Sequence, residues 1–352
     1  MSAGTSLVAI DGAYGEGGGA LLRVALAMSA MTQQPLRLSN VRGATNYPGL
    51  DPEDITIIRA MAESCGAETS GIAIGSPSFS FLPSRRAKGI SGRLDSVRNE
   101  SNRGANALVV LNSLLPLMAR SGVYCSVVAE GETFGSNALS FDAFSNVTLQ
   151  ALRKMGLYAY ATLQESGFGR ESVGEVLLDV EPSHIQGIDW SDRGALQSFQ
   201  AVVSTCNLPQ NVAERAIDHL SVLAKQANLP LTSEHLEIPG SSQGCFITVS
   251  AAFERGFGGG AAMGARGLRV ESLAQAAFEE AREWIKSEAA TDPYLADQIL
   301  LPCVFAEGSS SFSISRLTQR FLTSVWVVKQ FTPIHVTVRG SENRPGTITI
   351  QK

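Results

Sequence analysis

Histidine is scarce in this 352-residue chain, and its four copies limit the chemistry that the chain can perform. None of them lies at metal-ligand spacing from another, and the five cysteines are dispersed without any C-x-x-C pair. We therefore expect no structural metal, zinc included. An odd number of scattered cysteines in a chain without a recognisable export signal is typical of reduced, mostly buried thiols. This pattern predicts a cytoplasmic location.

Charge of one sign and long apolar runs are also lacking. Charged residues make up 17% of the chain and the net charge is -5, which argues against bulk electrostatic attraction to nucleic acid. The longest apolar run, 107–119, is interrupted by Asn112 and is too short to span a bilayer. Asp11 and Glu16 interrupt the only apolar stretch that could resemble a signal peptide. We expect no membrane partner, and any RNA site must be a local basic patch.

The stretch IDGAYGEGGGALL (10–22) joins a strand-like run to a helix-like run. Its glycines allow close approach of a ligand, and the following helix points free N–H groups and the positive end of its dipole into the loop. Glu16 adds a carboxylate and Arg23 a guanidinium, which suits a phosphate with a bound metal. A tight turn without a ligand explains the same pattern, and the spacing matches neither the Walker loop nor the dinucleotide fingerprint. The candidate phosphate-loop residues are Gly17, Gly18 and Gly19.

Strand and helix signals follow a repeating order along the chain. The order strand–helix–strand–helix–strand–strand runs through 1–85 and again through 86–180, which indicates an internal structural repeat. This order of strands and helices changes from about 185 to 270 and then resumes, which gives a third copy that is split by an insertion. The sequence therefore predicts an α/β (α+β) fold with a core at 1–184 and 271–352, helices packed on one face of mixed sheets, and an inserted α/β subdomain at 185–270.

A basic segment, SRRAKGISGRLDSVRNESNRG (84–104), is the best candidate for a polyanion footprint. It is explained equally well as a solvated surface, because such charged runs are usually exposed. If RNA binds there, replacing its first three cations should weaken binding and flatten its salt dependence. The candidate RNA-binding residues are Arg85, Arg86, Lys88, Arg93, Arg98 and Arg103.

The segment YLADQILLP (294–302) places three polar side chains on one helix face. Tyr294 lies three residues before Asp297 and four before Gln298. An aromatic ring, a carboxylate and an amide in this arrangement could stack a base, bind a metal or ribose, and recognise an amide edge. A half-buried tyrosine and a capping aspartate are the alternative, which the spacing alone favours. The nearby GARG element adds Gly264 and Arg266 as nucleotide-binding candidates.

Together these motifs resemble the RNA 3′-terminal phosphate cyclases. The resemblance is carried by IDGAYGEGGGALLR (10–23), the VRG-x4-PGL loop (41–50), GARG and YLADQILLP, and it runs nearly end to end with the motifs in order. It implies three βαβαββ repeats, as in these cyclases and the enolpyruvyl transferases, with a small α/β insert. It also implies that Glu16, Arg23 and Arg42 occupy phosphate and metal positions, Glu16 being the possible metal ligand, and that Tyr294, Asp297 and Gln298 line a nucleotide pocket.

The resemblance further implies a reaction. Members of the family use ATP and a divalent metal to adenylate a histidine and pass AMP to an RNA 3′-phosphate. The neighbouring 2′-hydroxyl then attacks to give a 2′,3′-cyclic phosphate. ATP, Mg²⁺ or Mn²⁺, and an RNA 3′ end are therefore the implied cofactors and partner.

The chain departs from the family pattern at the nucleophile. An ungapped alignment places Arg320 where the family has its histidine, and an arginine stays protonated and has no lone pair for attack on phosphorus. The family usually has an arginine where this chain has Thr45, and glutamines where it has Ala20 and Glu53. The nearest histidine, His335, lies in a strand-like segment and is expected to be a packed side chain.

These departures predict a divergent member that binds an RNA 3′ end or a nucleotide without the histidine–AMP step. The first alternative is an active ATP-dependent RNA 3′-phosphate cyclase, or a related phosphoryl or nucleotidyl transfer by another route. A further alternative is a protein–protein module in ribosome assembly or RNA processing, which would bring a protein partner. We expect the side chain of Arg320 to face the pocket and clamp a phosphate.

Overall fold

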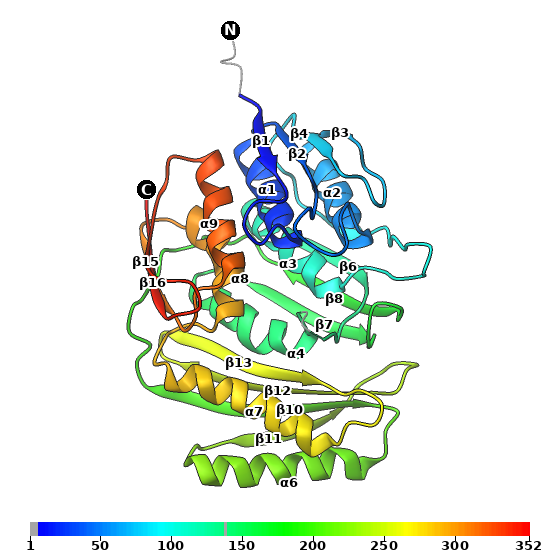
Figure 1. Cartoon of the computed structure of the whole chain (residues 1–352), viewed down its shortest axis with the longest axis vertical. Coiled ribbons are helices and arrows are strands. Elements are labelled where there is room, and N and C mark those ends of the chain that lie inside the picture. Colours follow the sequence, from blue (N-terminus) through cyan, green and yellow to red (C-terminus); the bar gives the residue numbers. More distant parts are fainter. Residues whose placement is uncertain (1–5, 137–138) are drawn as a thin grey trace.

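The computed structural model describes residues 6–136 and 139–352 of the chain. Residues 1–5 and 137–138, which fall in the expected core range 1–184, lie outside the described residues. Figure 1 shows a larger core with an additional layered lobe below it. In the described part, no helix combines the length and the apolar character needed to cross a bilayer.

Three copies of one strand–helix unit build the core, and each forms a four-stranded sheet with the same order. In the first copy β1 pairs in parallel with β2, and β4 pairs antiparallel with both β2 and β3. The second copy repeats this with β5, β6, β8 and β7. The elements of the first copy are β1 (Val8–Asp11), α1 (Gly19–Thr32), β2 (Leu36–Ser39), α2 (Pro52–Cys65), β3 (Glu68–Ser70) and β4 (Phe79–Leu82). Those of the second are β5 (Gly92–Arg93), α3 (Ala107–Arg120), β6 (Cys125–Gly131), α4 (Phe141–Ala143), a π-helical turn η1 (Phe144–Thr148), α5 (Leu149–Lys154), β7 (Ala159–Glu165) and β8 (Gly174–Val180).

The third copy is interrupted after its first strand. Its short strand β9 pairs in parallel with β14, and β16 pairs antiparallel with both β14 and β15. The elements are β9 (Asp189–Trp190), α8 (Pro293–Phe305), β14 (Ser310–Ile314), α9 (Gln319–Phe331), β15 (His335–Gly340) and β16 (Gly346–Gln351). The predicted fold of three βαβαββ repeats with a split third copy is therefore confirmed.

The inserted lobe is a mixed sheet with two long helices on one face. Its strands run in the order β11-β10-β12-β13, with β13 nearest the core and α6 farthest from it (Figure 1). The lobe has its own hydrophobic core between the sheet and both helices. Its elements are β10 (Leu196–Cys206), α6 (Gln210–Ala227), β11 (Thr232–Glu237), β12 (Gly244–Phe253), β13 (Gly256–Met263) and α7 (Val270–Lys286).

This lobe differs at both ends from the expected segment 185–270. Strand β9 pairs with β14 of the core, so the lobe begins after it. Helix α7, which the sequence analysis assigned to the core, packs against β12, β13 and α6. The glycine-rich stretch before α7 forms β13, where a Cβ at Gly260 would approach the Ala277 carbonyl oxygen to 2.4 Å. Glycine is used there because the helix packs directly on the strand.

Polar contacts fix the lobe to the core. The Ser204 hydroxyl on β10 donates to Asp142 Oδ2 of α4 at 2.8 Å, and burial raises the pKa of Asp142 to about 6. Asp292, the N-cap of α8, accepts from the N–H groups of Tyr294 and Leu295 through one oxygen and from Gly259 of β13 through the other. One buried aspartate thus caps a core helix and holds an insert strand.

The helix ends follow the capping signals in the sequence. Helix α2 begins after Asp51 with Pro52 in its first turn, and the Asp51 and Asp54 side chains form a reciprocal capping box. It ends at Gly66, whose φ of 59° is left-handed. Helix α3 begins at Ala107, and Asn106 caps it by accepting from the Val109 N–H.

Candidate functional site

A cleft of about 850 Å³ lies between the core and the inserted lobe. The first turns or caps of five helices reach it, through Gly19 of α1, Glu53 of α2, Asn106 before α3, Tyr294 of α8 and Arg320 of α9. Helix N-termini carry free N–H groups and a partial positive charge, so their convergence favours a bound anion. The predicted site residues that line it are Glu16, Gly19, Arg23, Arg42, Arg103, Tyr294, Asp297, Gln298 and Arg320.

The start of α1 is the clearest anion-binding feature in the cleft. Its N-cap, Gly18, provides no side-chain cap, and its first turn contains no acidic residue. A Cβ at Gly19 would lie 2.7 Å from Arg42 Nη2 and 2.8 Å from Arg23 Nη1. Two guanidinium groups therefore lie directly against an uncapped helix start. This combination suits a phosphate oxygen, which accepts from both main-chain and guanidinium donors.

Arg42 is fixed by its backbone and by two carboxylates. Its φ of 52° is left-handed, a conformation that is uncommon for a residue with a side chain. Its Nε and Nη2 donate to both oxygens of Asp54 at 2.8 and 2.9 Å, and Nη2 lies 2.9 Å from Asp51 Oδ2. Burial raises the pKa of Asp54 to about 6, with a further contribution from Asp51, while Arg42 opposes this shift. The ion pairs hold Arg42 in place despite its strained backbone.

Glu53 connects two more arginines to the same helix end. Its Oε1 accepts from Arg23 Nη1 at 2.9 Å, and its Oε2 accepts from Arg170 Nη2 at 3.2 Å and from the N–H of Asn106 at 3.1 Å.

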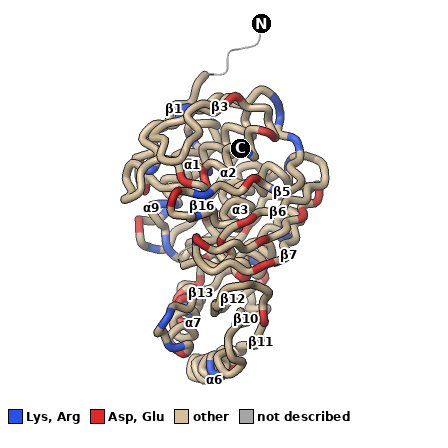
Figure 2. Tube along the Cα trace, turned by 90° about the vertical axis from the view of Figure 1, so that its right-hand side faces the viewer, with Lys and Arg blue, Asp and Glu red and all other residues tan. Residues whose placement is uncertain are grey.

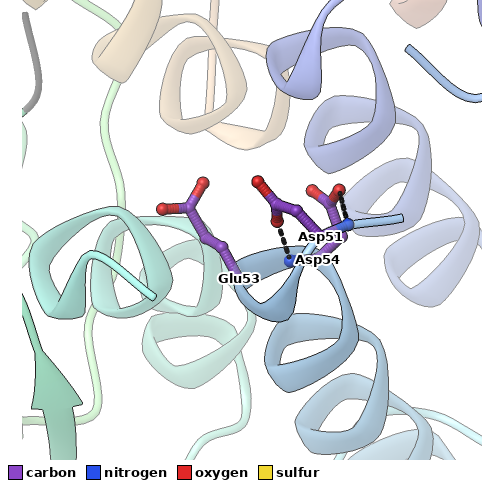
Figure 3. Close-up of side chains that lie close together, drawn as sticks. All are labelled: Asp51, Glu53 and Asp54. Atoms are coloured by element: carbon purple, nitrogen blue, oxygen red, sulfur yellow. Dashed lines mark hydrogen bonds between the residues drawn. The ribbon is translucent and has the colours of Figure 1, made fainter. Parts of the chain in front are cut away.

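Figure 3 shows the carboxylates of Asp51, Glu53 and Asp54 projecting from the first turn of α2. Their oxygens come within 4.8 Å of one another, but each carboxylate already has an arginine partner. The cluster is therefore an ion-pair network, which leaves little negative charge for a metal ion.

The opposite wall is formed by α8 and α9. Arg320 Nε lies 2.5 Å from Asp297 Oδ2, and the guanidinium carbon lies 5.8 Å from the centre of the Tyr294 ring. The Arg320 side chain thus faces the cleft, as expected. Burial raises the pKa of Asp297 to about 6, Arg320 opposes the shift, and the nearby Glu16 adds to it.

Two buried carboxylate oxygens in this region have no hydrogen-bond partner among the described residues. They are Glu16 Oε2 and Asp297 Oδ1. Buried polar atoms are normally paired, so these two oxygens indicate space for a cationic or protonated group. Carboxylate oxygens are the ligands that Mg²⁺ and Mn²⁺ prefer, and the residues present therefore fit a divalent cation.

Gln298 is already engaged within the protein. Its side-chain oxygen accepts a hydrogen bond from the Thr148 hydroxyl of η1. Tyr294, by contrast, is 46% exposed, so its ring is available to a planar ligand. The sequence analysis treated the two as equal contributors to a nucleotide pocket, whereas their surroundings in the structure differ.

Several candidate residues lie outside the cleft lining. Gly17 and Gly18 form the turn that leads into α1, and Gly17 has a left-handed φ of 59°. Gly264 and Arg266 lie in the connection between β13 and α7, where the Gly264 N–H donates to the Cys245 carbonyl and Arg266 is exposed.

The basic segment does not form one surface. Arg85 and Lys88 contact the C-terminal end of α2, whereas Arg103 lines the cleft near its N-terminal end. These ends are separated by 14 helical residues, a length of about 20 Å. Arg93 pairs with Glu175, and Arg98 donates to the carbonyls of Asn102 and Ser172. On the side drawn in Figure 2, positive and negative residues are interspersed.

None of the four histidines lines the cleft in the described part of the chain. His335 is exposed on β15, and the expectation of a packed side chain was wrong because side chains alternate along the strand, with His335 on the exposed face and Val336 on the buried one. His235 hydrogen-bonds to Thr205 within the inserted sheet.

The sequence analysis missed Arg170 and Asn106. Arg170 lies in the turn between β7 and β8 and contacts Glu53, which is 117 positions earlier in the sequence, so no local pattern could connect them. Asn106 had a readable signal, because an asparagine before an apolar helix is a common N-cap. Its side-chain nitrogen also donates to buried Glu132 at 3.0 Å.

The repeats, the inserted lobe and the cleft define a three-repeat α/β protein with an anion-suited site between core and insert. The chain belongs to the RNA 3′-terminal phosphate cyclase family, whose model matches residues 14–338. It is 31% identical to the RNA 3′-terminal phosphate cyclase of Methylococcus capsulatus over 98% of this chain and 96% of that protein. It is 32% identical to that of Thermococcus onnurineus, over 98% and 99% respectively. The enolpyruvyl transferase NikO from Streptomyces tendae aligns with a TM-score of 0.38 and 11% identity over 97% of this chain and 48% of its own, a likeness too low to carry an argument.

Proposed function

We propose that this chain binds an RNA 3′ end or a nucleotide in the cleft without forming a covalent histidine–nucleotide intermediate. The observation that carries the proposal is Arg320, which faces the cleft in an ion pair with Asp297, at the position where the family resemblance expects the nucleophile. A paired guanidinium has no lone pair to attack phosphorus. The cleft lining described by the structure offers no histidine in its place.

The ligand groups follow from the donors on each wall. A phosphate fits at the uncapped start of α1 beside Arg23 and Arg42, and a base can stack on the exposed Tyr294 ring. A divalent ion such as Mg²⁺ or Mn²⁺ would be held by Glu16 and Asp297, where it would neutralise phosphate charge. ATP is the nucleotide that the family resemblance suggests. A cytoplasmic role in RNA processing is part of this proposal.

A second candidate is retained phosphoryl or nucleotidyl transfer by another route. The unpaired oxygens of Glu16 and Asp297 favour it, because a metal-binding carboxylate pair is useful to chemistry as well as to binding. Formation of a 2′,3′-cyclic end on a 3′-phosphorylated RNA in the presence of ATP and Mn²⁺ would establish this candidate in place of the first.

Ligand-induced stabilisation tests the proposal. We expect ATP with Mn²⁺, or a short 3′-phosphorylated RNA, to raise the melting temperature of the wild-type protein. Arg23→Ala should abolish the shift, whereas Arg215→Ala, which removes an exposed guanidinium on the inserted lobe, should preserve it. No shift with either ligand would overturn the proposal and favour a protein–protein module.

A further inference from the structure

The arginines that flank the start of α1 are already paired in the structure. Arg23 is held by Glu53 at 2.9 Å, and Arg42 by Asp54 at 2.8 Å. Arg170, which lines the same cleft, pairs with Glu53 at 3.2 Å. An incoming anion therefore meets guanidinium groups whose charge is already balanced.

Glu53 is the carboxylate best placed to compete with such an anion. Its side chain is 7% exposed, and its two oxygens together accept from Arg23, Arg170 and the Asn106 N–H. These contacts join α1, the start of α3 and the β7–β8 connection to one carboxylate. Glu53 is thus fixed in place, with its charge directed at the same guanidinium that lies against the uncapped helix start.

The competition depends on the charge of the ligand. A phosphate monoester carries about −1.5 to −2 at pH 7, whereas a cyclic phosphodiester carries about −1 and a terminal hydroxyl none. Repulsion from a fixed carboxylate grows with the ligand charge and is strong where water is largely excluded. The doubly charged end therefore loses most from the presence of Glu53.

We propose that Glu53 is a specificity-determining residue that lowers the affinity of the cleft for a doubly charged 3′-phosphate end relative to an RNA end with one charge or none. This inference rests on the proposed function, because it assumes that an RNA end enters the cleft. It names the class of end that the wild-type site accepts most readily, namely a 2′,3′-cyclic phosphate or a free 3′-hydroxyl.

The test compares three RNA hexamers of one sequence that end in a 3′-phosphate, a 2′,3′-cyclic phosphate or a 3′-hydroxyl. Their affinities for the wild-type protein and for Glu53→Gln are measured by fluorescence anisotropy. Glutamine keeps the shape and an acceptor oxygen for Arg23 but removes the charge. We expect Glu53→Gln to bind the 3′-phosphate hexamer about tenfold more tightly and the 3′-hydroxyl hexamer within about twofold of wild type. The salt dependence for the 3′-phosphate hexamer should also steepen by about one counterion.

Glu132→Gln is the matched control, because Glu132 is a buried glutamate of the same cleft and, in the described structure, accepts from Asn106 and forms no ion pair with an arginine. It should change the 3′-phosphate affinity by less than about threefold. Two results would overturn the inference: an equal gain in 3′-phosphate affinity in both variants, or an unchanged preference among the three hexamers in a folded Glu53→Gln. In either case, binding that depends on Arg23 would still support the proposed function. Absence of binding to any hexamer by every variant would overturn both.

Discussion

The two walls of the cleft differ in how far their charges are satisfied. On the α2 wall, Arg42 pairs with Asp51 and Asp54, and Glu53 bridges Arg23 and Arg170. On the α8–α9 wall, Arg320 pairs with Asp297 through one oxygen, and the other oxygen has no partner among the residues that the structure describes. Unpaired buried oxygens are costly, so each of them needs a partner such as a water molecule, an ion or a ligand. The comparison therefore separates a wall whose charges are balanced within the protein from a wall that keeps a buried carboxylate oxygen for a ligand.

The largest expected effect comes from disrupting the ion pairs of the α2 wall. Arg42→Ala leaves the fully buried Asp54 without its cation, and we expect a loss of about 3–5 kcal/mol in the free energy of unfolding. Urea unfolding measures this loss. Arg215→Ala removes a guanidinium that contacts both oxygens of Glu271 on the exposed surface of the inserted lobe, and should cost less than about 1 kcal/mol. Equal losses in the two variants would contradict the assignment of Arg42 to a buried structural network.

The affinity for a ligand at the α8–α9 wall should depend on pH. Because the pKa of Asp297 is raised to about 6, its carboxylate is charged above pH 6 and becomes neutral as the pH falls. The carboxylate must be deprotonated to hold a cation, so the affinity for ATP with Mn²⁺ should fall by up to about tenfold per pH unit below 6. Isothermal titration calorimetry at pH 5.5 and 7.5 measures this change.

Asp297→Asn is the control for that experiment, because the nucleotide itself titrates in the same range. The variant should keep the contribution of the nucleotide and lose that of the carboxylate. An identical pH dependence in both proteins would show that Asp297 takes no part in cation binding.

A further loss of affinity is expected at Arg320. Arg320→Ala removes a cation that faces the cleft, and the affinity for ATP with Mn²⁺ should fall by about tenfold. Equilibrium dialysis measures the change, with Arg215→Ala as the remote control. An unchanged affinity would mean that Arg320 serves only to position Asp297, and the contrast between the walls would then rest on Asp297 and Glu16.

The fold could be predicted from the sequence because its signals are local and repeated. Asp51, Pro52 and Gly66 mark the ends of α2, and the order of strands and helices recurs in each copy. The limits of the inserted lobe could not be predicted in this way. Helix α7 stands where the repeating order of the core expects a helix, but it buries its apolar face on the inserted sheet.

Part of the cleft lining could be predicted from motifs, although the motif residues Gly17, Gly18, Gly264 and Arg266 lie outside it. Glu16, Arg23, Tyr294, Asp297 and Arg320 all line the cleft. The pairings were not predictable, because Glu53 meets Arg170 across 117 positions and no spacing rule links them. The placement of the basic segment was not predictable either, because Arg85 and Lys88 contact the C-terminal end of α2 whereas Arg103 lines the cleft.

Label transfer tests the central claim most directly. Wild-type protein is incubated with ATP labelled at the α-phosphate and Mn²⁺, denatured, and examined for covalently retained AMP, with an enzyme that forms a covalent histidine–AMP intermediate as the positive control. The account predicts no retained label, because Arg320 has no lone pair for attack and the described cleft lining includes no histidine. Label retained by the wild-type chain would contradict the account, and mapping its position would identify the nucleophile of an active enzyme.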